Sequence, residues 1–130
     1  MNRNFEHILE TIQIKDPRYK QEAYEFMMEA LTFTQKRIQA HRHVTGEELL
    51  DGAKDLVIRK FGPLAMTVLQ HWGVKNTEDF GHLVFNLVEN KILSKTEQDS
   101  IESFRNRYDF EDVFRRGYRN QLHKKISRMR

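Results

Sequence analysis

The chain has 130 residues, a length that suits one compact domain with a sizeable core. Apolar residues make up 38% and charged residues 32%, which argues against disorder of the whole chain, and the absence of cysteine excludes disulfides, thiolate metal sites and cysteine nucleophiles. No stretch approaches the roughly 18 apolar residues of a membrane span, and the first residues lack the apolar run of a signal peptide, so we expect a cytoplasmic protein.

Charge is distributed unevenly along the chain. All 19 acidic residues lie at or before Asp112, whereas seven of the 22 basic residues lie at or after Arg115. Residues 1–114 hold 15 basic and 19 acidic residues, a formal charge of −4, and residues 115–130 carry +7. We therefore expect a mildly acidic helical domain, 1–114, followed by a basic amphipathic tail, 115–130.

Two amphipathic patterns open the chain. Apolar residues at i, i+3, i+4 and i+7 predict a short first helix: Phe5, Ile8, Leu9 and Ile12. Pro17 ends any continuation of this helix. A second pattern extends from Tyr19 to about Ile38, and its apolar face is so broad that we expect a central, well-covered helix.

Start and stop signals then follow each other closely. Thr45 and Glu48 form a capping-box pattern, which predicts that a third helix begins there. Gly62 is a suitable C-terminal residue for this helix, and Pro63 can open the next one at its first position. The fourth helix should be short, because Gly73 provides another stop only ten residues later.

The remaining elements are predicted from weaker signals. Asn76 or Thr77 should cap a fifth helix, and Thr96 with Asp99 should precede a short sixth helix. Asp109 is a cap candidate for a last helix that continues an apolar line into the tail: Phe110, Val113, Phe114, Tyr118, Leu122, Ile126 and Met129. Residues 91–94 could pair briefly in a hairpin. The expected fold is all-α, a single compact domain of about six helices with a basic C-terminal helical extension.

Several runs of residues carry a resemblance to a known family: AYEFMMEAL (23–31), RHVTGEELL (42–50), FGPLAMTVLQHWGVKNTEDFGHLVFNLVE (61–89), DSIESF (99–104) and YDF (108–110). On these runs, from about Tyr19 to Phe114, the chain resembles a family of small bacterial proteins of unknown function, of the planctomycete and verrucomicrobial type. The resemblance implies a shared domain and names no active site. The basic end of the chain does not match the family pattern.

Metal binding and acid–base chemistry have only weak candidates. His41, His43 and Glu47 could gather around zinc or iron, but their spacing matches no ligand motif, and histidines that cap, pack or face water are the favoured interpretation. Acidic residues one turn apart predict a solvated helix face: Glu47, Asp51 and Asp55. We expect no metal and no cofactor.

Other functional templates fit poorly. The short helix, the turn at Gly73 and the following helix outline a helix-turn-helix, but Glu78 and Asp79 would repel DNA phosphates, so simple helix packing is favoured. Trp72 could be a stacking platform, although a core position is the favoured interpretation. The dispersed glycines cannot build a phosphate loop, and no HExxH or GxSxG motif occurs. Binding is therefore expected rather than catalysis.

The basic tail is the clearest functional signal. Its cationic residues are candidates for salt-dependent phosphate binding: Arg115, Arg116, Arg119, Lys124, Lys125, Arg128 and Arg130. The leading hypothesis is a non-enzymatic protein that associates with RNA or a ribonucleoprotein through this tail. The alternative is a protein-interaction adaptor whose tail docks as an amphipathic helix on a partner protein. Attachment to a membrane surface is disfavoured because the apolar line lacks Trp and Phe anchors.

Overall fold

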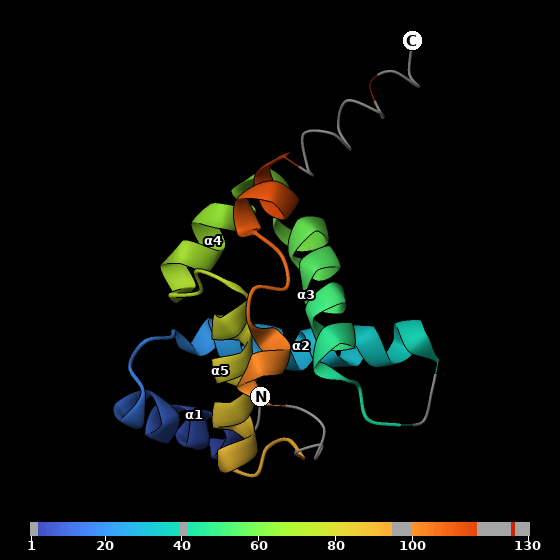
Figure 1. Cartoon of the computed structure of the whole chain (residues 1–130). Coiled ribbons are helices and arrows are strands. Elements are labelled where there is room, and N and C mark those ends of the chain that lie inside the picture. Colours follow the sequence, from blue (N-terminus) through green and yellow to red (C-terminus); the bar gives the residue numbers. More distant parts are fainter. Residues whose placement is uncertain (1–2, 40–41, 95–99, 117–125, 127–130) are drawn as a thin grey trace.

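The computed structural model describes residues 3–39, 42–94, 100–116 and 126. Within these residues the chain is all-α and forms a single compact domain without strands (Figure 1). Its α-helices are α1 (Arg3–Lys15), α2 (Gln21–Ile38), α3 (Gly46–Phe61), α4 (Ala65–Trp72) and α5 (Thr77–Glu89). Three short elements complete it: the 3₁₀ helices η1 (Gly62–Leu64) and η2 (Ile101–Phe104) and the π-helix η3 (Glu111–Arg116).

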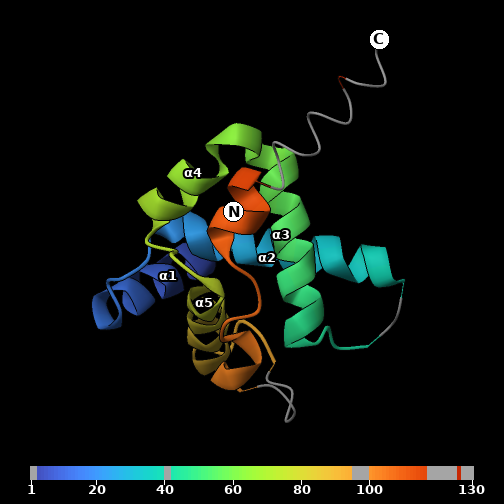
Figure 2. The ribbon, with the colours of Figure 1, turned by 45° about the horizontal axis from the view of Figure 1, so that its top comes forward.

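Helix α2 lies at the centre of the molecule. It contacts α1, α3, α4 and α5, and Figure 2 shows it passing behind α3 through the middle of the bundle. Its apolar residues are buried over more than one face: Ala23, Tyr24, Phe26, Met27 and Ala30. The prediction of a central helix is therefore confirmed. A broad apolar surface on one helix is stabilised only when neighbours cover it on several sides.

The predicted start signals of α3 and α5 are present as hydrogen bonds. Thr45 Oγ1 accepts from the backbone N–H of Glu48 at 3.1 Å, and Glu48 Oε1 accepts from the backbone N–H of Thr45 at 3.0 Å. At α5, Asn76 Oδ1 accepts from the N–H of Asp79 at 3.0 Å. Each bond satisfies a backbone donor that the first turn of a helix leaves unpaired, so both helices begin where the sequence predicts.

The predicted stops are also found, with one change at Pro63. Gly73 has a φ of 86° and ends α4 in the left-handed conformation that glycine adopts without a Cβ clash. Gly62 has a φ of 49° and breaks the chain direction after α3. Pro63 then lies in the 3₁₀ turn η1, and the α-helical part of the next element begins only at Ala65.

The predicted sixth helix is a single 3₁₀ turn in the structure, which corrects its type and length. Ser100 precedes η2, which ends at Phe104, while the predicted caps Thr96 and Asp99 lie outside the described residues. Asn106 adopts a φ of 49° and turns the chain away. The physical reason is that Phe104 is buried against α5, whereas Tyr108 bonds to α3, and one straight helix cannot serve both contacts.

Residues 91–94 do not form the hairpin that their sequence allowed as a possibility. Lys91 has a φ of 63°, and the N–H of Ile92 donates to the carbonyl of Leu87 at 2.9 Å. These features are typical of a chain reversal at a helix C-terminus, where the last carbonyls need donors. The local apolar pair that suggested a strand instead packs against the core.

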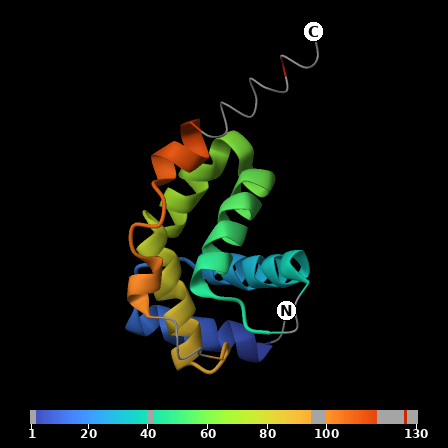
Figure 3. The same cartoon turned by 45° about the vertical axis from the view of Figure 1, so that its right-hand side comes forward.

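The last described element, η3, lies at the far end of the bundle from α1. It contacts α3, η1 and α4, and Figures 1 and 3 show it beside the end of α3. Phe110 and Phe114 are buried, and their ring centroids are 5.0 Å apart. The expected last helix is thus described as a π-helix up to Arg116, and its continuation lies outside the described residues except for Ile126, which is 46% exposed.

A candidate nucleic-acid interface

Two of the predicted phosphate-binding residues lie within the described part of the chain. Arg115 Nη1 is 2.9 Å from Glu111 Oε1, and Arg116 Nη1 is 3.0 Å from Asp112 Oδ1. All four side chains are substantially exposed, and such surface pairs contribute only about 0–1 kcal/mol. Both guanidinium groups can therefore exchange a carboxylate for a phosphate at little cost. The other predicted residues lie outside the described residues: Arg119, Lys124, Lys125, Arg128 and Arg130.

The start of the basic tail is anchored to the core. Phe110 packs on Phe80 of α5 at a ring distance of 5.6 Å, and Phe114 meets Tyr108 at 6.3 Å. The hydroxyl of Tyr108 in turn donates to the carbonyl of Leu50 in α3 at 2.7 Å, and burial raises the pKa of Tyr108. Because η3 extends from Glu111 to Arg116, it crosses the predicted boundary between domain and tail and presents the first two arginines on a fixed element.

A second basic region was not predicted and arises where α2 crosses α3. A shallow groove of about 730 Å³, the α2–α3 groove, is lined by Phe33, Lys36, Arg37, Asp55, Ile58 and Arg59. The half-buried ring of Phe33 has two guanidinium groups beside it: Arg37 Cζ is 5.9 Å and Arg59 Cζ is 5.3 Å from the ring centroid. Cations over an aromatic face are attracted by its quadrupole, so the ring and both cations form one cluster.

The charges of the α2–α3 groove are unbalanced. Arg37 forms an ion pair with Asp55. Arg59 lies one helical turn after Asp55 in α3 and is not paired with this carboxylate. Among the described residues, no ion pair or hydrogen bond engages the side chain of Lys36 or of Arg59, and both side chains are exposed. The groove thus holds three cations and one anion around the half-buried ring of Phe33. This combination suits a ligand that carries negative charge and flat rings.

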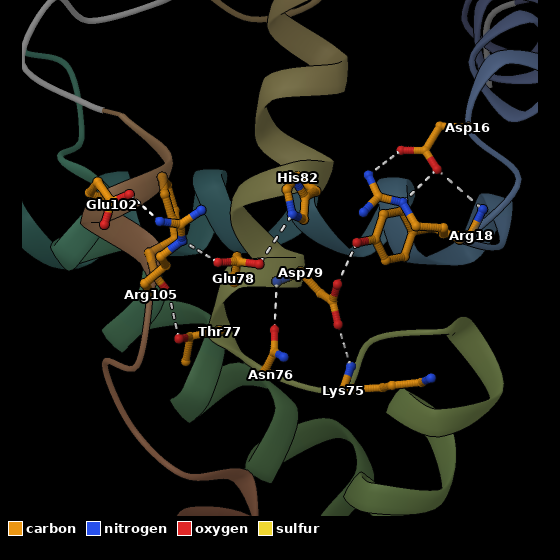
Figure 4. Close-up of polar contacts among 12 residues, drawn as sticks. Asp16, Arg18, Lys75, Asn76, Thr77, Glu78, Asp79, His82, Glu102 and Arg105 are labelled. Carbon is orange, nitrogen blue, oxygen red and sulfur yellow. Dashed lines mark hydrogen bonds and ion pairs between the residues drawn. The ribbon is translucent and has the colours of Figure 1, made fainter.

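The first turn of α5, the candidate recognition helix, is occupied by internal contacts (Figure 4). The carboxylate of Asp79 accepts from the hydroxyl of Tyr19 at 2.5 Å and from the backbone N–H of Lys75 at 2.8 Å. Burial, followed by the hydrogen bond to Asp79, raises the pKa of Tyr19. The tyrosine therefore remains a neutral donor, and Asp79 serves the junction between α5 and the segment that precedes α2.

The other side of the same turn is tied to η2. Glu78 pairs with Arg105, which also pairs with Glu102, and His82 Nε2 lies 3.5 Å from Glu78 (Figure 4). The hydrogen bond from Arg105 lowers the pKa of Glu78. With its start held on both sides and Phe80 fully buried, α5 packs firmly on the body, as the favoured interpretation of simple helix packing predicts.

The remaining candidates from the sequence are the stacking residue Trp72 and the metal-ligand candidates His41, His43 and Glu47. Trp72 is only 8% exposed and packs against Phe26 and Phe61 at ring distances of 5.4 and 5.5 Å, so it is a core residue, as favoured. His43 and Glu47 are exposed, and His41 lies outside the described residues. Among the side chains that the structure describes, no group of three or more His, Cys, Asp or Glu is placed to hold a metal ion.

An apolar pocket of about 550 Å³ lies between α2, α3 and α5. Its lining is mainly aliphatic and aromatic and includes Leu31, Leu49, Val84, Phe85, Val88 and Ile92. At its rim, both terminal nitrogens of Arg42 donate to the Glu48 carboxylate at 2.8 Å, which lowers the pKa of Glu48 to about 2. The Arg42 guanidinium is thus already paired with a carboxylate through two hydrogen bonds, and the rest of the pocket lining is chiefly apolar.

Comparisons with known proteins add no assignment to these features. No family model, no curated protein and no solved structure matches the chain. The resemblance to the small bacterial family accordingly stays a prediction. In the described part of the chain, no helix has the length and apolar character needed to cross a membrane.

Proposed function

We propose that the protein is a non-enzymatic binding protein that associates with RNA or a ribonucleoprotein through the basic tail that begins at Arg115. The supporting observation is the segregation of charge, −4 over residues 1–114 and +7 over residues 115–130, on a chain whose tail starts from an anchored element. An acidic body disfavours non-specific contact with phosphates elsewhere, while a cationic tail concentrates it at one end.

Binding through the tail would be electrostatic. Each phosphate that a Lys or Arg neutralises releases condensed counterions. The logarithm of the affinity therefore falls linearly with the logarithm of the salt concentration, and each contact with a single strand adds about 0.7 to the slope. The contacts of Arg115 and Arg116 with Glu111 and Asp112 do not oppose this, because they are weak, solvent-exposed pairs. Nothing in such a surface requires a base sequence.

A charge-neutralised tail tests this proposal in the full-length protein. One variant changes Lys124, Lys125, Arg128 and Arg130 to Gln, which takes the formal net charge from +3 to −1. We expect it to bind a labelled 20-nucleotide uridine RNA about tenfold or more weakly at low salt, because four phosphate contacts are lost. Fluorescence anisotropy measures the affinity.

The matched control removes the same charge from the body. It changes four exposed lysines to Gln: Lys15, Lys20, Lys75 and Lys91. We expect its RNA affinity to stay within about threefold of that of the unchanged protein. This variant loses only the long-range attraction that depends on net charge and keeps the direct phosphate contacts of the tail. If both variants lose RNA affinity equally, the tail has no special role. If neither variant loses affinity, the tail residues do not bind RNA.

The adaptor alternative, in which the tail docks on a partner, remains a prediction; an adaptor that instead receives a partner in its body is favoured by the apolar pocket between α2, α3 and α5. Partner proteins bury apolar anchors in pockets of this kind. A protein partner that copurifies after nuclease treatment at moderate salt, and is lost on Val88→Asp, would favour the adaptor over RNA association.

A further inference from the structure

We infer that the α2–α3 groove is a second nucleic-acid contact, in which Phe33 stacks on a base of a single strand. This inference rests on the proposed function and names its substrate class. It locates a base-binding position on the helical body, whereas the tail supplies charge only. The residues involved are those that line the groove, Lys36, Arg37 and Arg59 with Phe33.

The ring of Phe33 is held in place, and its faces are covered by the side chains of Arg37 and Arg59, both of which are exposed and can move. Its neighbour Thr34 is 2% exposed and faces α3, which fixes the rotation of α2 at this point. Phe33 itself is half-buried and lines an open groove. A ring whose neighbours are mobile guanidinium groups lets a base insert against the ring or stack on a guanidinium plane, and such stacking has no sequence preference because every base has a π-face.

The cations around the ring match the rest of a nucleotide. Arg59 and Lys36 engage no carboxylate among the described residues, and Arg37 is only partly neutralised by Asp55. A nucleotide brings a flat base and a phosphate within the span of one residue, so it can contact the ring and an adjacent cation together. Guanidinium planes also stack on bases. A duplex hides its base faces, so a single strand fits this groove better.

The groove and the tail lie at connected places on the body. Arg59 and Lys60 form the basic last turn of α3, and α3 contacts η3, from which the tail starts. Figures 1 and 3 show the end of α3 and η3 at the same end of the molecule. The last turn of α3, which carries Arg59, and the start of the tail therefore lie at the same end of the molecule, while the Lys60 ammonium of that turn is paired with Glu29.

The test uses the full-length protein and labelled 12-nucleotide uridine RNA. Phe33→Leu keeps an apolar side chain but removes the π-face, and we expect it to weaken binding by about 5- to 20-fold at every salt concentration. Its salt slope should stay unchanged because no charge is lost, whereas Arg59→Gln should reduce the slope by about 0.7. A 12-base-pair RNA duplex should bind equally to Phe33→Leu and the unchanged protein.

Fluorescence gives a direct readout of stacking. Phe33→Trp should retain binding, and its indole emission should be quenched on addition of the uridine RNA, over the background of the buried Trp72. Phe85 is a half-buried aromatic residue outside the groove, so Phe85→Leu and Phe85→Trp are matched controls without an expected effect. The same oligomer in deoxythymidine form shows whether RNA and DNA are distinguished.

The outcomes separate this inference from the proposed function. Equal affinity of Phe33→Leu and the unchanged protein, or Phe33→Trp emission that does not change, overturns the base-stacking role and leaves the tail proposal standing. If the unchanged protein binds no RNA at low salt, both are overturned. If an acidic aromatic peptide binds the groove in place of RNA, the groove is a protein contact and the inference is wrong.

Discussion

Asp16 shows how one partly buried loop residue can organise a helical junction. Its carboxylate accepts from Arg18 Nε and Nη2, both at 2.7 Å (Figure 4). It also accepts from Asn86 Nδ2 at 2.9 Å. Asn86 also donates to the hydroxyl of Tyr24 in α2 at 3.0 Å. The hydrogen bonds from Arg18 hold the pKa of Asp16 well below its usual value. The ionised carboxylate thus links the α1–α2 connection to α5.

Asp16→Asn should lower the free energy of unfolding by about 1–2 kcal/mol at pH 7, because charge-assisted hydrogen bonds that are partly open to solvent become neutral ones. The pKa of the folded state is depressed, so the stabilisation is complete above the unfolded pKa near 3.8 and is lost as pH falls below it. Urea unfolding followed by Trp72 fluorescence at pH 7 and at low pH measures this.

Asp112→Asn is the control for this prediction. Asp112 also faces an arginine, but its side chain is 56% exposed and its pair lies within one helical turn. We expect a change within about 0.5 kcal/mol at every pH. A difference between Asp16→Asn and the unchanged protein that stays constant from pH 7 down to low pH would show that the Asp16 charge has no role in stability.

Phe33 and Trp72 show that the same class of side chain can have opposite roles. Both belong to helices with an apolar stripe, and a lone tryptophan is the more conspicuous residue in the sequence. Trp72 nevertheless contacts Phe26 and Phe61, so no ligand can reach its faces. Phe33 has guanidinium groups for neighbours and remains half-buried. Accessibility, which depends on the neighbouring helix, decides between core and platform.

At the level of the elements, the crossing of α2 and α3 depends on a missing side chain. Gly52 is buried in the middle of α3, and a Cβ at this position would overlap Thr34 Oγ1 of α2. The hydroxyl of Thr34 donates to the carbonyl of Ala30 at 2.7 Å, which keeps it directed along its own helix. The two helices can therefore approach closely at this point, and the groove forms where they diverge.

Gly52→Ala should destabilise the protein by about 1–2 kcal/mol, although alanine is the better helix former by about 1 kcal/mol. The overlap with Thr34 outweighs this propensity, because a packed crossing can relax only by separating the helices. Thermal unfolding of Gly52→Ala, Thr34→Ala and the double variant measures the coupling. The double variant should recover most of the loss. Additive effects of the two changes would contradict a direct clash.

The whole molecule combines a mildly acidic helical body with cations concentrated at one end of α3 and in the tail. If the groove and the tail bind the same strand, the second contact becomes intramolecular and increases the affinity without new chemistry. This arrangement makes the length of the RNA a variable that tests the molecule as a unit.

A uridine RNA of 20 nucleotides should bind the unchanged protein about tenfold or more tightly than one of 6 nucleotides, because only the longer strand can engage both surfaces. Phe33→Leu and the tail variant should each lose most of this gain. Isothermal titration gives affinity and stoichiometry together. A gain that is proportional to length in all variants would show independent, non-specific sites instead.

Much of the fold could be predicted because its signals are local. The capping box at Thr45, the Asn76 cap and the left-handed stop at Gly73 act within a few residues, so chain order alone reveals them. The all-α class and the central position of α2 followed from apolar spacing. The 3₁₀ helix η2 and the π-helix η3 differ from the ordinary helices that the sequence predicts, because their shape depends on where Phe104 and Tyr108 pack.

The sequence by itself determined the helix starts and stops, the all-α class and the segregation of basic residues after Arg115. Only the tertiary structure brought Phe33 of α2 and Arg59 of α3 together. It also paired Asp55 with Arg37 of α2 instead of with Arg59 of its own helix. The reason is that caps and charge runs are encoded by neighbours in the chain. A groove between two helices depends on their crossing, which long-range packing around Gly52 and Thr34 sets.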